Sequence, residues 1–274
     1  MQEPGFYTLS NFVRIPRIGF GTWQLPDSPE AVKTIRTAIQ RGYRLIDSAQ
    51  MYHNEVSVGE AAKTSGVPRC DIFITSKLAN DAHGYHETIA ACEESLSKLQ
   101  MEYIDLFLIH WPYTAHHQDG KDEHNANTWR AFEQLYRDGK VLSIGVSNFM
   151  PHHIENLCKT ASIPPMVNQL RLFPGITQPD TVACCKQHGI LPEAYSPLGY
   201  GLALEMPTLV DLAGKYGKTV AQICLRWSIQ MGFLPIPKTA NAVRMDENLD
   251  VFDFELSEDD MQIITTLPPP QERG

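Results

Sequence analysis

The chain has 274 residues, a formal net charge of −9 and an isoelectric point near 5.5, so it lacks the excess of Lys and Arg that binding to nucleic acid requires. Its N-terminal segment has no basic start followed by an apolar run, and no stretch approaches the roughly 18 apolar residues of a membrane span. We therefore expect a cytoplasmic protein with no nucleic-acid partner and no membrane segment.

The first segment, FYTLSNFVRIP (6–16), alternates polar and apolar residues, which predicts a β-hairpin that closes the bottom of a larger domain. After it, short apolar runs alternate with segments whose apolar residues recur at spacings of three and four, as strands alternating with helices do. The predicted strands are 17–22, 44–49, 72–77, 103–110, 141–148, 166–172, 190–196 and 233–239. The predicted helices are 28–41, 54–65, 86–99, 126–138, 151–160, 178–188, 206–216, 219–230, 242–249 and 257–266.

Helix starts are marked by Ser28, which precedes Pro29, and by Asn54. The strands are continuous apolar runs, which indicates parallel strands buried on both faces. Eight strand–helix units favour a closed (β/α)₈ TIM barrel over an open doubly wound sheet, which more often has five or six strands. We predict an α/β fold with one domain over residues 1–274, an N-terminal hairpin and extra C-terminal helices.

Four polar residues, Asp47, Tyr52, Lys77 and His110, lie at or just past the ends of three successive predicted strands. The carboxyl ends of parallel barrel strands meet at one rim, so these side chains are expected to converge there. A tyrosine transfers protons poorly at neutral pH unless a nearby cation favours its ionised form, and Lys77 could be that cation. Asp47 could balance a buried Lys77, and His110 could orient a substrate carbonyl.

Each of these residues also has an ordinary structural interpretation. Asp47 could cap a helix, Lys77 could be a surface lysine, His110 could lie in the core, and Tyr52 could pack in a loop. Their joint position at the same end of consecutive strands favours an active site.

The sequence resembles the aldo-keto reductase family along almost its full length. Eight motifs match in the family's order, namely GFGTW, LIDSAQMYHNE, ITSKL, DLFLIHWP, SIGVSNF, VNQ, AYSPLG, and IPKT followed by NAVRMDENLDVFDFELS. The resemblance is greatest to small bacterial members of the 2,5-diketogluconate reductase and prostaglandin F synthase type. It implies NADPH-dependent reduction of aldehydes or ketones, in which Tyr52 is the general acid, Asp47 and Lys77 tune it, and His110 positions the carbonyl.

The resemblance also implies NADPH binding without a Rossmann fold, and the sequence lacks GxGxxG. Lys238 and Arg244, with Thr239 and Asn241, would surround an anion where the last strand meets a helix N-terminus. Because a 2′-phosphate fits such a site, we expect NADPH to be preferred over NADH. Glu247 and Asn248 match family positions that contact the adenine. A solvated charged loop is the alternative interpretation of this stretch.

Further cofactor contacts are implied at the other strand ends. The ring of Tyr195 would stack on the nicotinamide, because a flat aromatic suits stacking, and polar side chains would bind its carboxamide. The implied carboxamide ligands are Ser147, Asn148 and Gln169, the pyrophosphate would lie along Ser196, Leu198 and Gly199, and Gly21, Thr22, Trp23 and Asp47 would border the same cleft. Trp23 and Trp111 are expected to wall an apolar substrate pocket together with Tyr52 and His110, although two tryptophans could equally pack in a core.

Three residues depart from the family pattern: Ala79 follows ITSKL where close relatives often carry tryptophan, and Arg171 and Phe173 stand where many have glutamate and histidine. We expect them to affect substrate preference rather than activity.

Two other classes of function remain. A non-catalytic NADP-binding regulatory or interaction subunit could use the same barrel, since a fold does not fix a function. A hydrolase is disfavoured because Ser147 lacks the closing glycine of GxSxG, and no metal is expected because the histidines lack HExxH spacing. We expect a monomer that acts on a small-molecule carbonyl compound.

Overall fold

The computed structural model describes residues 5–112 and 121–270. Eight parallel strands pair with their neighbours in chain order. The backbone N–H groups of Gly19 and Gly21 donate to the carbonyls of Pro235 and Pro237, each at 3.0 Å, and so join the last strand to the first. The strands are β3 (Phe20–Gly21), β4 (Leu45–Asp47), β5 (Phe73–Leu78), β6 (Leu106–Ile109), β7 (Ile144–Ser147), β8 (Val167–Arg171), β9 (Leu191–Tyr195) and β10 (Leu234–Ile236). The predicted closed barrel is confirmed.

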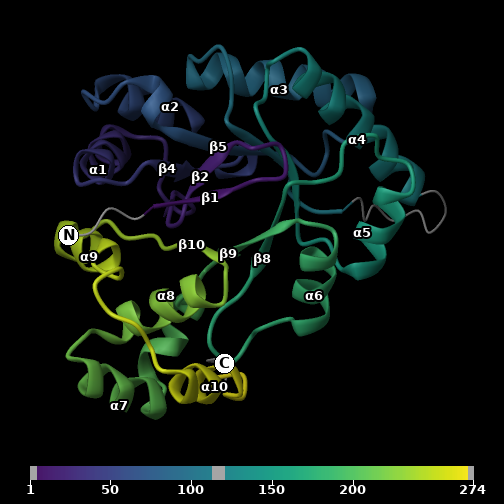
Figure 1. Cartoon of the computed structure of the whole chain (residues 1–274). Helices are drawn as coiled ribbons and strands as arrows, with labels where there is room; N and C mark the ends of the chain where they lie inside the picture. The colour runs from purple at the N-terminus through teal and green to yellow at the C-terminus, as the bar shows by residue number, and fades with distance from the viewer. Residues whose placement is uncertain (1–4, 113–120, 271–274) are drawn as a thin grey trace.

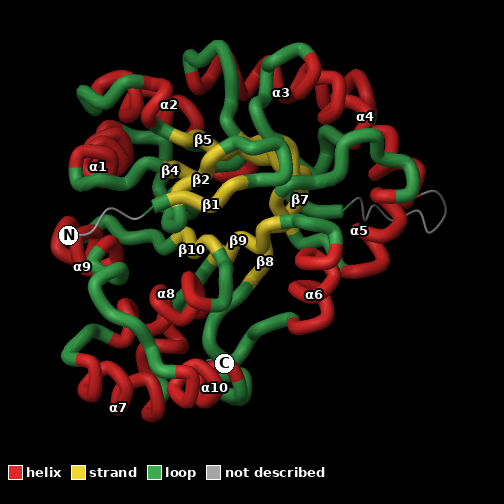
Figure 2. The backbone as a smooth tube through the Cα atoms, in the orientation of Figure 1, coloured by secondary structure: helices red, strands yellow, loops and turns green. Residues whose placement is uncertain are grey.

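Helices form the outer layer around this ring of strands, as Figures 1 and 2 show. They are α1 (Pro29–Gln40), α2 (Glu55–Thr64), α3 (Tyr85–Leu99), α4 (Lys121–Arg137), α5 (Pro151–Cys158), α6 (Pro179–Gln187), α7 (Pro207–Tyr216), α8 (Val220–Gln230), α9 (Ala242–Leu249) and α10 (Glu258–Thr265). Short 3₁₀ helices cover η1 (Gln50–Tyr52), η2 (Arg69–Asp71) and η3 (Gly199–Glu205). Every predicted helix is present, although α4 begins at Lys121 and therefore earlier than the sequence indicated.

Two predicted helix starts behave differently. The Ser28 hydroxyl accepts a hydrogen bond from the Ala31 N–H at 3.2 Å and caps α1. Asn54 precedes α2 but makes no side-chain cap. Its amide donates instead to the carbonyls of Thr22 and Leu25, each at 2.9 Å, so it ties the loop after β3 to the start of α2.

The N-terminal hairpin closes the amino end of the barrel. Its strands β1 (Phe6–Thr8) and β2 (Arg14–Pro16) pair antiparallel and lie in front of the ring in Figure 2. The Tyr7 hydroxyl donates to the carbonyl of Phe233 at 3.1 Å, and the Asn11 amide donates to that of Leu142 at 2.9 Å. Because these carbonyls precede β10 and β7, the hairpin crosses the amino ends of the strands, as predicted.

A buried carboxylate lies at the same end. One oxygen of Asp105 accepts hydrogen bonds from the Arg69 guanidinium at 2.6 Å and from the Ile74 N–H at 2.9 Å. This arrangement links the start of β5 to the start of β6.

In the described part of the chain, no helix has the length and apolar character needed to cross a membrane.

Candidate active site

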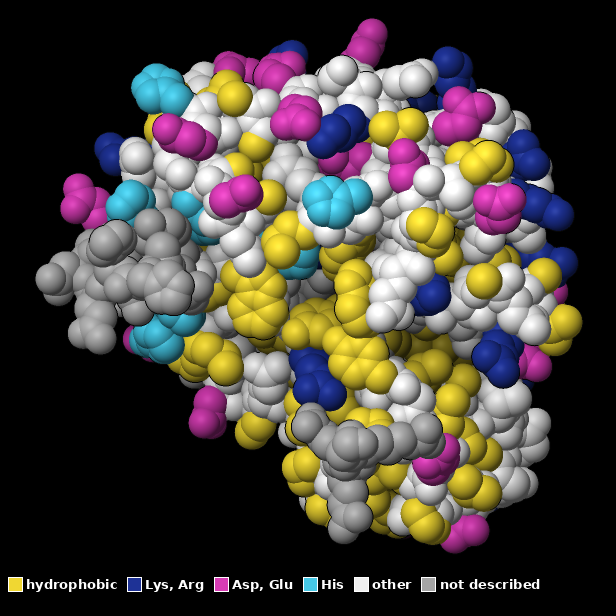
Figure 3. All heavy atoms as spheres, turned by 180° about the vertical axis from the view of Figure 1, so that it is seen from behind, with side chains coloured by type: hydrophobic (Ala, Val, Ile, Leu, Met, Phe, Trp, Pro, Cys, Tyr) yellow, Lys and Arg dark blue, Asp and Glu magenta, His cyan; other side chains and the backbone are white. Residues whose placement is uncertain are grey.

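A cleft of about 560 Å³ opens at the carboxyl ends of the strands. Figure 3 shows the face opposite the hairpin, with a hollow bordered by hydrophobic side chains. Many of the residues singled out in the sequence line this cleft: Gly21, Trp23, Asp47, Tyr52, His110, Trp111, Ser147, Asn148, Gln169, Tyr195, Ser196, Leu198 and Lys238. The structure thus gathers side chains from widely separated strand ends around one cavity.

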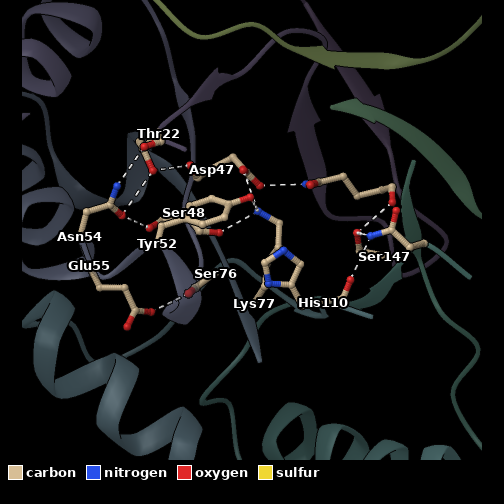
Figure 4. Close-up of polar contacts among 12 residues, drawn as sticks. Thr22, Asp47, Ser48, Tyr52, Asn54, Glu55, Ser76, Lys77, His110 and Ser147 are labelled. Atoms are coloured by element: carbon tan, nitrogen blue, oxygen red, sulfur yellow. Dashed lines mark hydrogen bonds and ion pairs between the residues drawn. The ribbon is translucent and has the colours of Figure 1, made fainter. Parts of the chain in front are cut away.

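Lys77 lies at the centre of a hydrogen-bonded cluster beneath this cleft (Figure 4). Its side chain is fully buried, and its ammonium donates to the Asp47 carboxylate at 2.7 Å, the Ser48 carbonyl at 2.8 Å and the Tyr52 hydroxyl at 3.2 Å. Asp47 ends β4 and Tyr52 ends η1, so a one-turn helix after the strand brings the phenol back over the lysine. The predicted Asp–Lys–Tyr arrangement is therefore present in space.

The charges of this cluster depend on each other. Burial disfavours the charged ammonium, but Asp47 and Tyr52 outweigh burial and raise the pKa of Lys77 above its usual value. Burial also raises the pKa of Tyr52, and the positive Lys77 opposes this rise only in part. Lys77 thus acts in the direction that the sequence suggested, but desolvation of the phenol is the larger effect, and Tyr52 stays protonated at neutral pH.

His110 follows β6 and faces the same phenol. Its ring meets that of Tyr52 edge to face, with centroids 5.7 Å apart. Burial, assisted by the charge of Lys77, lowers the pKa of His110 to about 3. The imidazole is therefore neutral at neutral pH and can donate one hydrogen bond into the cleft without adding a charge.

Polar side chains at the ends of β7, β8 and β9 are already connected to each other. The Asn148 amide donates to the carbonyl of His110 at 3.1 Å, and its oxygen accepts from the Tyr195 hydroxyl at 3.1 Å. The Gln169 amide donates to Asp47 at 2.8 Å. These contacts hold the groups that could bind an amide in fixed orientations and join them to the Lys77 cluster.

Backbone strain coincides with the same strand ends. Asn148, directly after β7, has a φ of 61°, and Ser196, directly after β9, has a φ of 47°. Residues other than glycine adopt this left-handed region rarely, and such strain concentrates at functional sites. The two turns direct both residues into the cleft, which they line.

Other residues predicted to bind the cofactor lie outside the cleft lining. Thr22, Gly199 and Thr239 are buried, while Asn241, Arg244, Glu247 and Asn248 lie at or along α9. Asn248 is only 4% exposed and lies beside the Tyr43 hydroxyl, where it packs α9 against the barrel.

The anion site predicted at the start of α9 also differs in detail. The Asn241 side chain caps the helix by accepting hydrogen bonds from the N–H groups of Val243 and Arg244. These two N–H groups are therefore already bonded. The positive charge comes instead from the exposed side chains of Lys238 and Arg244, which form no ion pair with any described residue.

The aromatic walls of the cleft include a residue that the sequence did not single out. Trp23 and Trp111 are each 43% exposed, so they are not core residues. The Tyr200 ring lies 5.6 Å from that of Trp23, and Arg171 lies over the Tyr200 ring at 5.3 Å. Its position directly after the glycine of AYSPLG was the only sequence signal for Tyr200. Tyr200 and Leu204 both line the cleft.

The three departures from the family pattern have distinct positions. Arg171 lies behind the Tyr200 wall and also over the ring of Phe173 at 5.4 Å. The Phe173 ring packs so closely on Gly199 that a Cβ there would lie 2.5 Å from it. Ala79 does not line the cleft, and its N–H donates to Gln50. Arg171 and Phe173 thus support the wall indirectly.

A TIM barrel with a buried Asp–Lys–Tyr cluster below a cleft at the carboxyl ends of its strands indicates a barrel enzyme. The comparisons with known proteins identify its family. Residues 17–268 match the family model described as "Aldo/keto reductase family". The chain is 48% identical to a glyoxal reductase of Bacillus subtilis over 94% of this chain and 91% of that protein. It is 45% identical to a 9,11-endoperoxide prostaglandin H2 reductase of Trypanosoma cruzi, over 95% and 90% of the two chains.

Solved structures agree with this result. An aldo/keto reductase from Brucella melitensis superimposes with a TM-score of 0.91 at 43% identity, covering 97% of this chain and 98% of that one. A Bombyx mori aldo-keto reductase in complex with NADP gives a TM-score of 0.89 at 35% identity, over 97% and 93% of the two chains. The chain belongs to the aldo/keto reductase family, and it is an oxidoreductase that acts on small-molecule carbonyl compounds.

Proposed function

We propose that the protein reduces aldehydes or ketones to alcohols with NADPH, reversibly, and that Tyr52 is the general acid. The observation that supports this most directly is the Lys77 ammonium, which lies 3.2 Å from the Tyr52 hydroxyl and 2.7 Å from the Asp47 carboxylate at the base of the cleft. A protonated phenol with a fixed cation behind it can give up a proton to a developing alkoxide and have the resulting negative charge stabilised at once.

The proton states favour reduction. Tyr52 keeps its proton at neutral pH because burial raises its pKa, and Lys77 keeps its charge because Asp47 faces it. When Tyr52 releases the proton to the substrate oxygen, its phenolate becomes the partner of the Lys77 ammonium. Asp47 maintains the position of that ammonium through a short ion pair.

His110 is proposed to orient the carbonyl. As a neutral imidazole it can donate a hydrogen bond to the carbonyl oxygen while leaving the proton transfer to Tyr52. Trp23 and Trp111 offer apolar walls that exclude water from the carbonyl and align it with the phenol. Tyr200, held between Trp23 and Arg171, would contribute to the choice of substrate.

The residues of the cleft fit a nicotinamide dinucleotide. Tyr195 offers a flat ring, and Ser147, Asn148 and Gln169 offer fixed polar groups. Lys238 in the cleft lining and Arg244 on α9 offer exposed cations without carboxylate partners in the described parts of the chain. A bound NADPH would supply the hydride for the carbonyl carbon. The two cations suit the extra 2′-phosphate, which supports a preference for NADPH over NADH.

Replacing Tyr52 by Phe tests the proposal. The variant keeps the ring but loses the proton, so we expect the turnover of glyoxal with NADPH to fall about 10²–10⁴-fold while the Kd for NADPH stays within about twofold. Glyoxal is a suitable first substrate because the Bacillus subtilis relative is named a glyoxal reductase. Absorbance of NADPH reports turnover, and its fluorescence reports binding.

Tyr103→Phe is the matched control, because Tyr103 stacks on Arg69 at the amino end of the barrel and should leave turnover unchanged. Undiminished turnover in Tyr52→Phe contradicts the proposed role. NADPH binding by the wild-type protein with negligible turnover across a panel of aldehydes and ketones would favour the alternative, a non-catalytic NADP-binding subunit.

A further inference from the structure

Glu193 is a carboxyl group in the middle of the barrel. It lies on β9, beside Gln169 on β8 and Leu234 on β10 in the strand register. Glu193 is 0% exposed, and neither of its carboxyl oxygens has a hydrogen-bond partner among the described residues. Burying such a group without a partner costs about 1–3 kcal/mol, and more when the group is charged, so its presence calls for an explanation.

The charged groups that shift the pKa of Glu193 belong to the candidate active site. Asp47 on β4 and Lys77 on β5 are the two charges that perturb it most, and its own charge acts on Tyr52 in η1. The flanking strands present only uncharged neighbours at its level, and the amide of Gln169 donates to Asp47. Glu193 is therefore a second carboxyl group, after Asp47, near the Lys77 ammonium.

Charge balance depends on the proton of Glu193. Burial, with a further contribution from the negative Asp47, raises the pKa of Glu193 to about 8, although Lys77 and the nearby Gln169 amide oppose this rise. Near neutral pH, Glu193 is thus a neutral acid, and the Lys77 and Asp47 charges cancel. When Glu193 loses its proton to solvent at higher pH, the cluster carries one net negative charge next to Tyr52.

We propose that Glu193 is a positioning residue whose buried carboxyl group, beside Lys77 and Asp47, controls through its charge how readily Tyr52 releases a proton. When Glu193 is a neutral acid, Asp47 is the one carboxylate of this cluster that balances the charge of Lys77. As a carboxylate, Glu193 adds a second negative charge that opposes formation of the Tyr52 phenolate. This inference depends on the proposed function, in which Tyr52 is the acid.

The pH profile of reduction tests the proposal, with Glu193→Gln as the variant because it keeps the shape and removes the titration. In the wild type, kcat with saturating NADPH and glyoxal should fall about three- to tenfold from about pH 7 to about pH 9, as Glu193 ionises. In Glu193→Gln, kcat should change less than about 1.5-fold over this range, because Tyr52 itself titrates higher. Glu193→Leu gives the same flat profile and serves if the amide variant folds poorly.

Glu55→Gln is the matched control. Glu55 is also a buried carboxyl, but it accepts a hydrogen bond from Ser76 at 2.6 Å and points away from Tyr52 in Figure 4. This variant should keep the wild-type profile. Coincident profiles for the wild type and Glu193→Gln would overturn the proposal.

Infrared spectroscopy gives a readout that does not depend on activity. The wild-type protein should show the carbonyl stretch of a protonated carboxyl group that disappears from about pH 7 to about pH 9, and Glu193→Gln should lack this band. If Tyr52→Phe retains turnover, the proposed function fails, yet this band still reports the charge of Glu193. If the band is missing from the wild type while Tyr52→Phe is inactive, the proposed function stands and the role of Glu193 is wrong.

Discussion

Two buried carboxyl groups, one at the hairpin end of the barrel and one toward the cleft, differ in their hydrogen-bond partners. At the hairpin end, Asp105 accepts hydrogen bonds from the Arg69 guanidinium and the Ile74 N–H. Toward the cleft, Glu193 has no hydrogen-bond partner in the described residues and shares its surroundings with Lys77 and Asp47. Hydrogen bonds to a buried carboxyl group offset part of the cost of its burial, whereas an unbonded one keeps the full cost and calls for a functional explanation. The comparison predicts that substitutions at the two ends affect different measurements.

Lys77→Met should have the largest effect. It removes the only ammonium that contacts Tyr52 among the described residues and leaves Asp47 without its cation, so we expect kcat to fall about 10²–10⁴-fold. Steady-state kinetics on protein shown to be folded by circular dichroism would measure this. Lys98→Met, at an exposed lysine paired with Glu94, is the control and should be fully active. A fall in kcat of less than about threefold in Lys77→Met would contradict a catalytic role for the cleft end of the barrel.

Asp105→Ala should affect stability and spare catalysis. It removes hydrogen bonds to a charged group, so we expect the free energy of unfolding in urea to fall by about 1.5–3 kcal/mol, with kcat unchanged. Asp71→Ala, at an exposed carboxylate near the same end, should change stability by no more than about 0.5 kcal/mol. A large drop in the kcat of folded Asp105→Ala protein would show that the two ends are not independent.

Arg244→Ala should give the smallest effect, and it separates cofactor binding from catalysis at the cleft end of the barrel. If this exposed guanidinium faces a 2′-phosphate, its loss should weaken NADPH binding about tenfold, or about 1.4 kcal/mol, and leave NADH binding unchanged. Fluorescence titrations with both cofactors would measure this difference. Lys186→Ala, at an exposed lysine on α6, is the control. Equal weakening for both cofactors would contradict a 2′-phosphate site.

Much of the fold followed from the sequence because its pattern was regular. Continuous apolar runs identified all eight strands, and apolar spacings of three and four identified the helices. The limits were local. β3 has only the two residues Phe20 and Gly21, fewer than the apolar run suggested. The ring closes with a close approach at Gly21, where a Cβ would lie 3.0 Å from the carbonyl of Ile236. The 3₁₀ helix that carries Tyr52 is too short to have a periodic signal.

The site was predicted less evenly than the fold. Residues at strand ends, such as Asp47 and His110, follow from the barrel topology because every such end reaches the same rim. Tyr200 did not, because its contact with Trp23 joins two loops far apart in sequence. Glu193 was hidden inside a run interpreted as an apolar strand, although an acidic residue in a strand buried on both faces is itself unusual.

Closure of the ring between β3 and β10 has a consequence for biosynthesis. The strand pair that completes the barrel, and the Tyr7 hydrogen bond to Phe233 that spans 226 positions, both require the last quarter of the chain. During translation β3 and β9 therefore remain open edges until β10 leaves the ribosome, and exposed strand edges invite association with other chains. We therefore expect a nascent polypeptide that lacks β10 to aggregate more readily than the complete chain.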